Sequence, residues 1–320
     1  MKTIILSSLL FLSFAYSQYS YTVGNVGGAR RAGETNQFRM TVQNAGKTAY
    51  TIERTIPFDV PYPLISFNEM TGMTVLRYVF DGFVEVYHPN GKKIWEHSFF
   101  KDEEPNYERT IGSVIGKWSV YFLVSDAYRE KALVYQFAPD GVLRWTVTLP
   151  HQYAYEIAVS ENEETIIAGS YLALEDEVRQ SAALLNFRGE TEGNIDILFR
   201  KAVFSEDGRF IALSSEREAV IVSRSAKQEI ARTKKQSDGI ITDMIWSGNN
   251  LLVQESNVVT PNDGRFYYAN PSIITYTTEL KPLSMKEFDG VKFLESELRR
   301  NGKMIELILD RGKSRIVVDK

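Results

Sequence analysis

Apolar and polar residues alternate along short segments of this chain, and each segment ends at a turn signal. In residues 84–87 the valines alternate with Glu85 and Tyr87, which is the two-residue period of a β-strand. The turn signals Asn90-Gly91 and Asp140-Gly141 follow two such segments, and these dipeptides favour tight β-hairpins because both positions accept a positive φ. An aromatic residue lies four positions after each glycine. The pattern predicts a recurring hairpin.

A second type of hairpin alternates with the first. It has an apolar pair, a turn and an apolar strand, and residues 202–213 around Gly208 are its clearest copy. Its turns recur at intervals of 44, 47, 45, 42 and 52 residues, at Gly72, Gly116, Glu163, Gly208, Asn250 and Gly302. Two hairpins per period of about 45 residues make four strands, which is the spacing of a β-propeller blade.

The number of hairpins predicts how many blades the propeller has. Six clear hairpins of each type favour an all-β fold with six four-stranded antiparallel blades. The chain opens on the hairpin in residues 38–53 and closes on the strand in residues 314–318, so we expect these ends to share one blade and close the ring. Seven blades is the alternative if residues 19–56 contain another pair of strands. The Gly24–Gly28 segment is interpreted as a flexible lead-in.

Composition narrows the chemistry that the propeller could perform. The 320 residues are 43% hydrophobic with a formal net charge of −4, so no basic field indicates a nucleic-acid partner. Basic pairs such as Lys234-Lys235 are isolated, and we interpret them as too few for a polyanion site. The absence of cysteine excludes disulfides, thiolate metal sites and cysteine nucleophiles.

The first residues have the pattern of a secretory signal peptide. Lys2 precedes an apolar run over residues 3–15, and Ala15 and Ser17 form a small-x-small cleavage site. The run is shorter than the ~20 residues that a membrane-spanning helix needs. We therefore expect residues 1–17 to be removed and residues 18–320 to form a single propeller domain, exported to the periplasm or secreted, with no membrane span.

Three segments resemble known propeller repeats. Residues 86–95 and 135–145, each a strand, a turn and a tryptophan, resemble pyrroloquinoline-quinone-type repeats, and residues 203–213 are similar to the WD40-like repeats of exported bacterial TolB-type propellers. Such propellers include quinone-dependent dehydrogenases and cofactor-free scaffolds. The chain has no vicinal cysteine pair of the kind that many quinone dehydrogenases use, so we expect no cofactor.

No motif in the chain assembles a catalytic or metal centre. His88 and His97 flank one hairpin and are interpreted as the polar edge of an outer strand, and His151 as a surface residue. The acidic runs 102–104, 161–164 and 175–177 lack the spacing of a calcium loop, so we interpret them as solvated turns. The Gly-x-Ser-x-Gly motif of serine hydrolases does not occur. We predict no catalytic, cofactor or metal residues.

Two long insertions are the candidates for recognition. Residues 171–179 lengthen one blade and residues 257–271 another. In the second insertion, Arg265, Tyr267 and Tyr268 have the composition of a recognition loop. The alternative is that Phe266 and Tyr268 simply cover a blade.

These observations favour an exported, non-enzymatic propeller that binds or scaffolds a protein partner. Two other classes stay open. One is a periplasmic or secreted hydrolase or lyase with its active site at the propeller channel. The other is a lectin-like propeller that binds a glycan, or another small molecule, through its aromatic loops.

Overall fold

The computed structural model describes residues 19–28, 31–79, 81–99, 109–126, 128–235, 238–260 and 266–319. The expected signal peptide therefore lies outside the described residues. The chain divides into two compact units. The first unit comprises Met1–Tyr78 and Phe83–Phe99, and the second unit comprises Val79–Gly82 and Phe100–Lys320.

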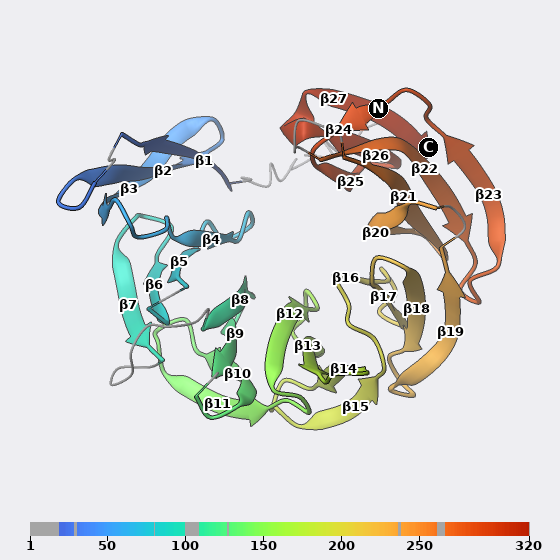
Figure 1. The fold of residues 1–320 in the computed structure, drawn as a ribbon, viewed down its shortest axis with the longest axis horizontal. Coiled ribbons are helices and arrows are strands. Elements are labelled where there is room, and N and C mark those ends of the chain that lie inside the picture. Colours follow the sequence, from blue (N-terminus) through green and yellow to red (C-terminus); the bar gives the residue numbers. More distant parts are fainter. Residues whose placement is uncertain are drawn as a thin grey trace, which may run out of the picture. The chain divides into compact units, whose positions relative to one another are not determined.

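The first unit contains two antiparallel sheets, shown in blue and cyan in Figure 1. The first sheet has three strands, β1 (Tyr19–Val26), β2 (Thr35–Asn44) and β3 (Lys47–Pro57). The second has four, β4 (Leu64–Phe67), β5 (Thr74–Tyr78), β6 (Phe83–Tyr87) and β7 (Lys93–Ser98). Buried side chains of β2 and β3, including Phe38, Met40 and Ile52, pack against Leu76 and Tyr87 of the second sheet.

The second unit contains five antiparallel sheets that follow one another in chain order (Figure 1). The first two sheets are β8 (Thr110–Ile115), β9 (Val120–Asp126), β10 (Lys131–Phe137) and β11 (Leu143–Thr148), then β12 (Tyr153–Val159), β13 (Ile166–Ala173), β14 (Val178–Leu185) and β15 (Thr191–Ile195). The third is β16 (Lys201–Phe204), β17 (Phe210–Ser214), β18 (Glu218–Ser223) and β19 (Gln228–Lys234). The fourth is β20 (Ile240–Ser247), β21 (Asn250–Val259), β22 (Tyr267–Tyr276) and β23 (Pro282–Glu287), with β24 (Lys292–Phe293) also paired to β22. The last is β25 (Ser296–Asn301), β26 (Met304–Leu309) and β27 (Ser314–Asp319).

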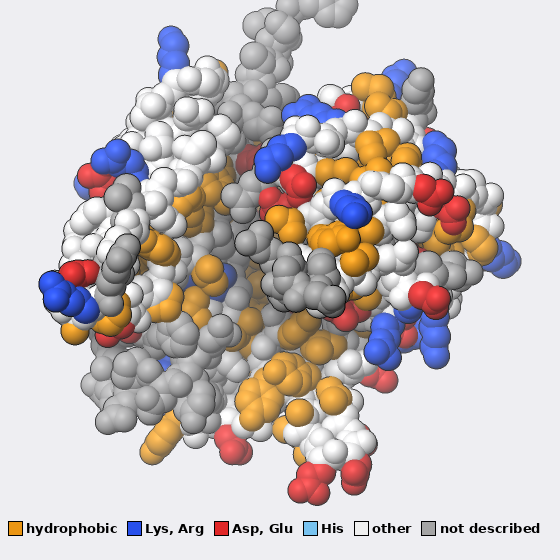
Figure 2. Space-filling model, turned by 45° about the horizontal axis from the view of Figure 1, so that its top comes forward, with side chains coloured by type: hydrophobic (Ala, Val, Ile, Leu, Met, Phe, Trp, Pro, Cys, Tyr) orange, Lys and Arg blue, Asp and Glu red, His pale blue; other side chains and the backbone are white. Residues whose placement is uncertain are grey.

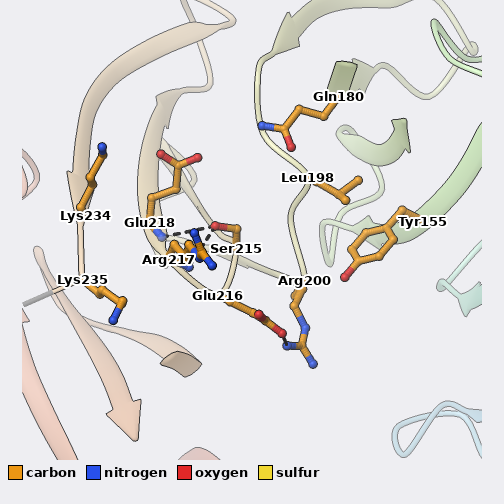
Figure 3. Close-up of a pocket in the computed structure, with 10 residues that line it drawn as sticks. All are labelled: Tyr155, Gln180, Leu198, Arg200, Ser215, Glu216, Arg217, Glu218, Lys234 and Lys235. Carbon is orange, nitrogen blue, oxygen red and sulfur yellow. Dashed lines mark hydrogen bonds and ion pairs between the residues drawn. The ribbon is translucent and has the colours of Figure 1, made fainter. Parts of the chain in front are cut away.

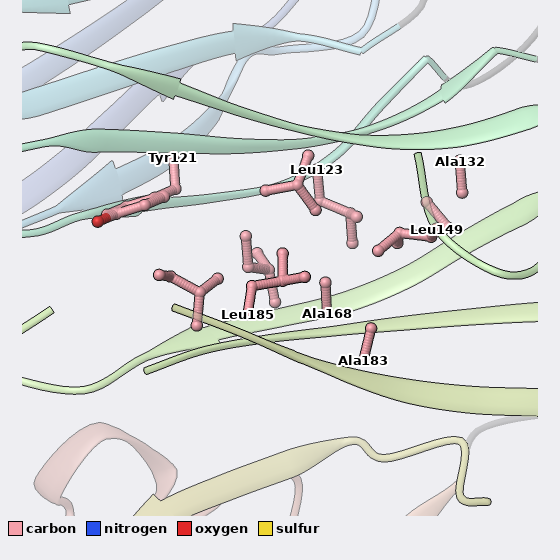
Figure 4. Packing of buried hydrophobic residues seen from close by; sticks show 11 residues of the cluster. Tyr121, Leu123, Ala132, Leu149, Ala168, Ala183 and Leu185 are labelled. Atoms are coloured by element: carbon pink, nitrogen blue, oxygen red, sulfur yellow. The ribbon is translucent and has the colours of Figure 1, made fainter. Parts of the chain in front are cut away.

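The core of the second unit lies between successive sheets. Side chains of β9 and β10, such as Tyr121, Leu123 and Val134, pack against Ile166 and Leu185 of the next sheet (Figure 4). Similar clusters join the following sheets. The middle strands are therefore buried on both faces, which explains their nearly continuous apolar sequence. Within the described residues, the helical content is the short 3-10 turn η1 (Asp310–Gly312), and no helix is long and apolar enough to cross a membrane.

The repeated aromatic residue four positions after a glycine covers the turn of the neighbouring sheet. A Cβ on Gly189 would lie 2.8 Å from the ring of Trp145, whose indole N–H donates to the carbonyl of Phe187 in the same turn at 2.9 Å. In the first unit, a Cβ on Gly91 would lie 2.6 Å from the Cβ of Tyr50 and 2.9 Å from its ring. Gly91 and Gly189 have φ of 82° and 81°, so both the backbone and the close ring require glycine. This contact gives the sequence repeat its physical reason.

A buried carboxylate joins the first two sheets of the second unit. Glu163, in the turn between β12 and β13, is fully buried and accepts the backbone N–H of Trp118 at 2.5 Å and the hydroxyl of Tyr121 at 2.9 Å. A Cβ on Gly116 would lie 2.3 Å from the Glu163 carboxylate, so the neighbouring turn has to carry glycine there. The interpretation of this acidic run as a solvated turn is wrong for Glu163.

An arginine joins the second and third sheets of the same unit. Arg224, after β18, donates to the hydroxyl of Thr165 at 2.9 Å and forms an ion pair with Glu164 at 2.6 Å. Its side chain is 16% exposed, so the guanidinium is largely withdrawn from solvent. Both bonds end in the β12–β13 turn, which also carries Glu163. This turn therefore contacts the sheet before it through Glu163 and the sheet after it through Arg224.

The count of sheets corrects the prediction of six blades and confirms the alternative of seven. Residues 19–26 form β1 and pair with β2 along their whole length, so the interpretation of residues 24–28 as a flexible lead-in is wrong for residues 24–26. Tyr19, Tyr21 and Val23 alternate with Ser20, Thr22 and Gly24 as in a strand, but Tyr21 and Val23 are exposed. The expected joining of the two ends in one blade is also wrong, because β1–β3 and β25–β27 form separate three-stranded sheets.

Candidate functional site

Two pockets of the second unit lie next to each other at one end of its sheets. At this end, which we call the turn face, the second strand of each sheet turns into the third and the chain crosses to the next sheet. The turn after β17 and the connections before β16 and after β19 meet there. Loops held on a rigid scaffold of strands are the usual place for binding residues.

The large pocket of the turn face has a volume of about 750 Å³ (Figure 3). It lies between the second and third sheets of the unit. Its lining residues come from β12, β14, the two connections and the β17–β18 turn: Tyr155, Gln180, Leu198, Arg200, Ser215, Glu216, Arg217, Glu218, Lys234 and Lys235. This volume is within the range of small-molecule and peptide side-chain sites.

The two carboxylates of the large pocket are held by guanidinium groups. Glu216 forms an ion pair with Arg200. Glu218 is paired at 2.9 Å with Arg232, which does not line the pocket and also contacts Glu229 at 2.6 Å. The lining therefore has four cationic side chains against two carboxylates.

Backbone hydrogen bonds fix the turn that carries Arg217. The Ser215 hydroxyl accepts the backbone N–H of Arg217 at 3.2 Å and that of Glu218 at 3.3 Å, as a serine commonly does in a tight turn. The backbone N–H of Lys235 donates to the carbonyl of Arg217 at 2.9 Å. The end of β19 and the β17–β18 turn are thus tied together, so their basic side chains share one rim of the pocket.

Tyr155 provides a hydroxyl and an aromatic wall on the other side of the large pocket. Figure 3 shows its ring pointing toward Arg200. Burial raises the pKa of the Tyr155 hydroxyl, so it stays protonated at neutral pH and can donate a hydrogen bond. Tyr171 packs edge-to-face on the Tyr155 ring at 6.2 Å and lies 5.3 Å from the ring of Tyr153. The three rings form an aromatic platform beside the basic rim.

A small pocket of about 270 Å³ adjoins the large one and shares Arg200 with it. Its lining includes Lys201, Tyr268 and the exposed Leu294. Lys201 is paired at 2.9 Å with Asp243, a buried carboxylate that also accepts the backbone N–H of Leu298 at 2.6 Å. This pair orders the floor between the third and the last two sheets.

The described residues of the predicted recognition loop, Tyr267 and Tyr268, lie at the turn face. Tyr267 and Tyr268 begin β22, and Tyr268 lines the small pocket while it stacks on Phe293 at 5.5 Å. The ammonium of Lys292 lies 5.1 Å from the ring centre of Tyr267. Arg265 lies outside the described residues. Tyr268 therefore covers its sheet, as the alternative interpretation expects, and also borders a pocket.

The histidines identified in the sequence do not meet. His88 accepts the backbone N–H of Asn90 at 3.3 Å within its turn, whereas His97 packs on Phe99 at 4.7 Å. His151 lies in the connection between β11 and β12, where its backbone N–H donates to Ser170 at 3.3 Å. Among the described residues, no three His, Asp or Glu side chains gather as a metal site. The acidic run 102–104 lies outside those residues.

Sequence reasoning missed the residues that line the large pocket. Lys234-Lys235 was considered as an isolated pair, and Tyr155, Arg200 and Arg217 were not identified at all. They come from separate segments, so no local motif connects them, and only the packing of two sheets brings them together. On the face shown in Figure 2, basic and acidic side chains are interspersed. The overall charge of the chain therefore gives no indication of the basic residues that line the large pocket.

The sequence matches no family model and no curated protein. Among solved structures, the chain is similar to one in the crystal structure of a mitotic checkpoint complex, with a TM-score of 0.58 and 9% identity over 97% of this chain and 94% of that one. A protein of unknown function from Bacteroides caccae is also similar, with a TM-score of 0.45 and 8% identity over 85% of this chain and 94% of that one. Together with the seven antiparallel sheets that the described residues form, the first likeness shows that this chain has a β-propeller fold.

Proposed function

We propose that this protein is an exported, non-enzymatic propeller that binds or scaffolds a protein partner on the turn face of its second unit. The observation that carries the proposal is the pair of adjoining pockets that share Arg200. Together they offer basic, aromatic and aliphatic side chains from four sheets. A partner could therefore contact several sheets at once without any of them having to move.

The composition of this surface supports a protein partner. Arginine and tyrosine, which are enriched at the centres of protein interfaces, occur here as Arg200, Arg217, Tyr155 and Tyr268. Leu294, at the rim of the small pocket, is 67% exposed. A large aliphatic side chain beside a polar pocket is the type of feature that a partner covers on binding.

The hydrogen bonding in the large pocket supports a binding rather than a catalytic role. The Ser215 hydroxyl already accepts two backbone N–H groups, so its lone pairs serve the turn. The carboxylates of Glu216 and Glu218 form ion pairs with arginines, so both are already engaged inside the fold. These groups position the pocket walls.

Affinity capture with one pair of matched variants tests the proposed surface. Leu294→Arg places a long charged side chain on the turn face, whereas Leu283→Arg makes the same change on the outer strand β23, where Leu283 is 57% exposed. We expect a partner captured by the full chain, and then rebound as a purified protein, to be lost with Leu294→Arg and kept with Leu283→Arg. Equal binding by both variants, or equal loss, would overturn the proposal.

Export is tested separately on the protein from its own host. Mass spectrometry of the exported fraction should find a chain that begins at Gln18, as the cleavage site after Ser17 predicts. An intact chain beginning at Met1 and confined to the cytoplasm would overturn this part of the proposal.

A further inference from the structure

We infer that the large pocket binds an acidic segment of the partner, a stretch of peptide with carboxylate side chains. The inference rests on the proposed function, because it names the chemistry of what binds at the turn face. It is carried by the arrangement of charge in the pocket, which differs in sign from the protein as a whole.

The excess of positive charge is local and comes from three separate segments. Arg200 precedes β16, Arg217 lies in the β17–β18 turn, and Lys234 and Lys235 end β19 (Figure 3). The whole chain, by contrast, has a formal charge of −4. A concave site with an excess of one sign of charge attracts ligands of the opposite sign and speeds their association.

The lining has more cationic than anionic side chains. It contains four cations, Arg200, Arg217, Lys234 and Lys235, and two carboxylates, Glu216 and Glu218. Glu216 is paired with Arg200 inside the lining, and Glu218 is paired with Arg232, which lies outside it and also binds Glu229. The formal excess of the lining is therefore two positive charges.

Arg217 is the group best placed to receive a carboxylate. Its side chain is exposed, and within the described part of the chain it has no ion pair. The turn that carries it is fixed by the Ser215 hydroxyl, so the guanidinium is presented from a rigid backbone. A guanidinium offers a planar pair of N–H donors that matches the two oxygens of a carboxylate.

Neutral donors opposite the basic rim fit the same ligand. The Tyr155 hydroxyl and the side-chain amide of Gln180 both line the pocket, and each can donate a hydrogen bond to a carboxylate. With Arg217 on the facing side, a carboxylate between them would receive donors from two directions. Two successive acidic residues of a peptide would fill more of the 750 Å³ than one.

Fluorescence anisotropy with labelled peptides tests the inference on the full chain. The probe is a short peptide in which Glu alternates with Ser, and its matched control replaces every Glu by Gln. We expect the Glu peptide to bind at least about ten-fold more tightly than the Gln peptide, and to be weakened by added salt, because surface charge is screened. Equal binding of the two peptides, or no binding of either, would overturn the inference.

A pair of arginine variants shows whether the binding occurs in the large pocket. Arg217→Glu should reduce the affinity for the Glu peptide by about ten-fold or more, since one favourable contact is replaced by a repulsive one. Arg188→Glu makes the same charge change at an exposed position in the β14–β15 turn, at the opposite end of the sheets, and should change the affinity less than about two-fold. Equal losses would show attraction to the protein's general field and refute a site at Arg217.

The two proposals fail in different ways. If Leu294→Arg abolishes capture of the partner but the Glu peptide does not bind, the protein-binding surface stands and its acidic specificity is wrong. If the Glu peptide requires Arg217 but capture is indifferent to Leu294→Arg, the large pocket binds acidic peptides, and the captured partner does not dock across both pockets as proposed. Inorganic phosphate as a competitor separates the sources of charge: displacement of the peptide at low phosphate concentration would indicate a general anion site and overturn a peptide-specific one.

Discussion

Replacing Glu163 by alanine should destabilise the second unit by about 3 kcal/mol. The change removes the acceptor of two hydrogen bonds, from the Trp118 backbone and the Tyr121 hydroxyl. A buried donor left without an acceptor costs roughly 1–3 kcal/mol. Tyr121 is fully buried and bears this cost in full, whereas the 46% exposed Trp118 has water close by to replace part of its bond. The total therefore falls in the lower half of the range of about 2–6 kcal/mol for two donors.

Urea unfolding followed by far-ultraviolet circular dichroism measures the change, with the unfolding m-value checked for constancy. Glu161→Ala is the control, because Glu161 is an exposed residue of the same turn and its replacement should cost less than about 0.5 kcal/mol. In a double-mutant cycle with Tyr121→Phe, the coupling energy to Glu163→Ala should be about 1–2 kcal/mol. Equal losses for Glu161→Ala and Glu163→Ala, or a coupling near zero, would refute the reasoning.

Three further predictions concern the turns. Gly91→Ala should lower the free energy of unfolding by several kcal/mol, because a clash with Tyr50 adds to the roughly 1–2 kcal/mol that an alanine costs at positive φ. Gly46→Ala, at φ 76° with nothing within 4 Å of the added Cβ, should cost only this backbone strain. Equal urea midpoints for the two variants would contradict the prediction. Arg224→Ala should destabilise the second unit by about 1–3 kcal/mol by removing its bonds to the neighbouring sheet, and an unchanged melting temperature would contradict it. Hydrogen bonds, first of all from the backbone N–H of residue 209, lower the pKa of Asp207 from 3.8 to about 2. The contribution of the ionised Asp207 to folding stability should therefore be present above about pH 4 and be lost as the pH falls toward 2, and Asp207→Asn should remove this part of the pH dependence. A pKa of 3.8 or more for Asp207, measured by nuclear magnetic resonance, would refute this prediction.

The sequence predicts the hairpins well because their chemistry is local. The turns at Gly91 and Gly141 have a positive φ, which the dipeptides Asn90-Gly91 and Asp140-Gly141 predict. The strand β1 was missed although Tyr19, Tyr21 and Val23 alternate with smaller or polar residues, because it ends in the glycine-rich residues 24–28, which are typical of a loop. The blade count changed because β1–β3 form a sheet of their own instead of joining the C-terminal strands.

The candidate site was beyond sequence reasoning for a different reason. Arg200, Arg217 and Lys235 belong to different segments, and each is ordinary in its own neighbourhood. For Glu163 the sequence led to the opposite error. The acidic run 161–164 was interpreted as solvated, but one of its side chains, Glu163, is buried. The sign of a pocket and the burial of a single carboxylate both depend on which sheets are neighbours, which a period of hydrophobicity does not specify.

The aromatic–glycine contacts between neighbouring sheets limit how such a chain can gain, lose or exchange repeats during evolution. Trp145 requires a glycine in the next sheet's turn, which Gly189 supplies. Gly193 lies four positions after Gly189, where the repeat would have an aromatic residue. A Cβ on Gly193 would lie 2.6 Å from the carbonyl oxygen of Lys227, in the β18–β19 turn of the next sheet. A duplicated or transposed repeat would place a large ring where this carbonyl lies. Neighbouring repeats are thus matched in pairs, so the linear order of the sheets is inherited together with their sequences.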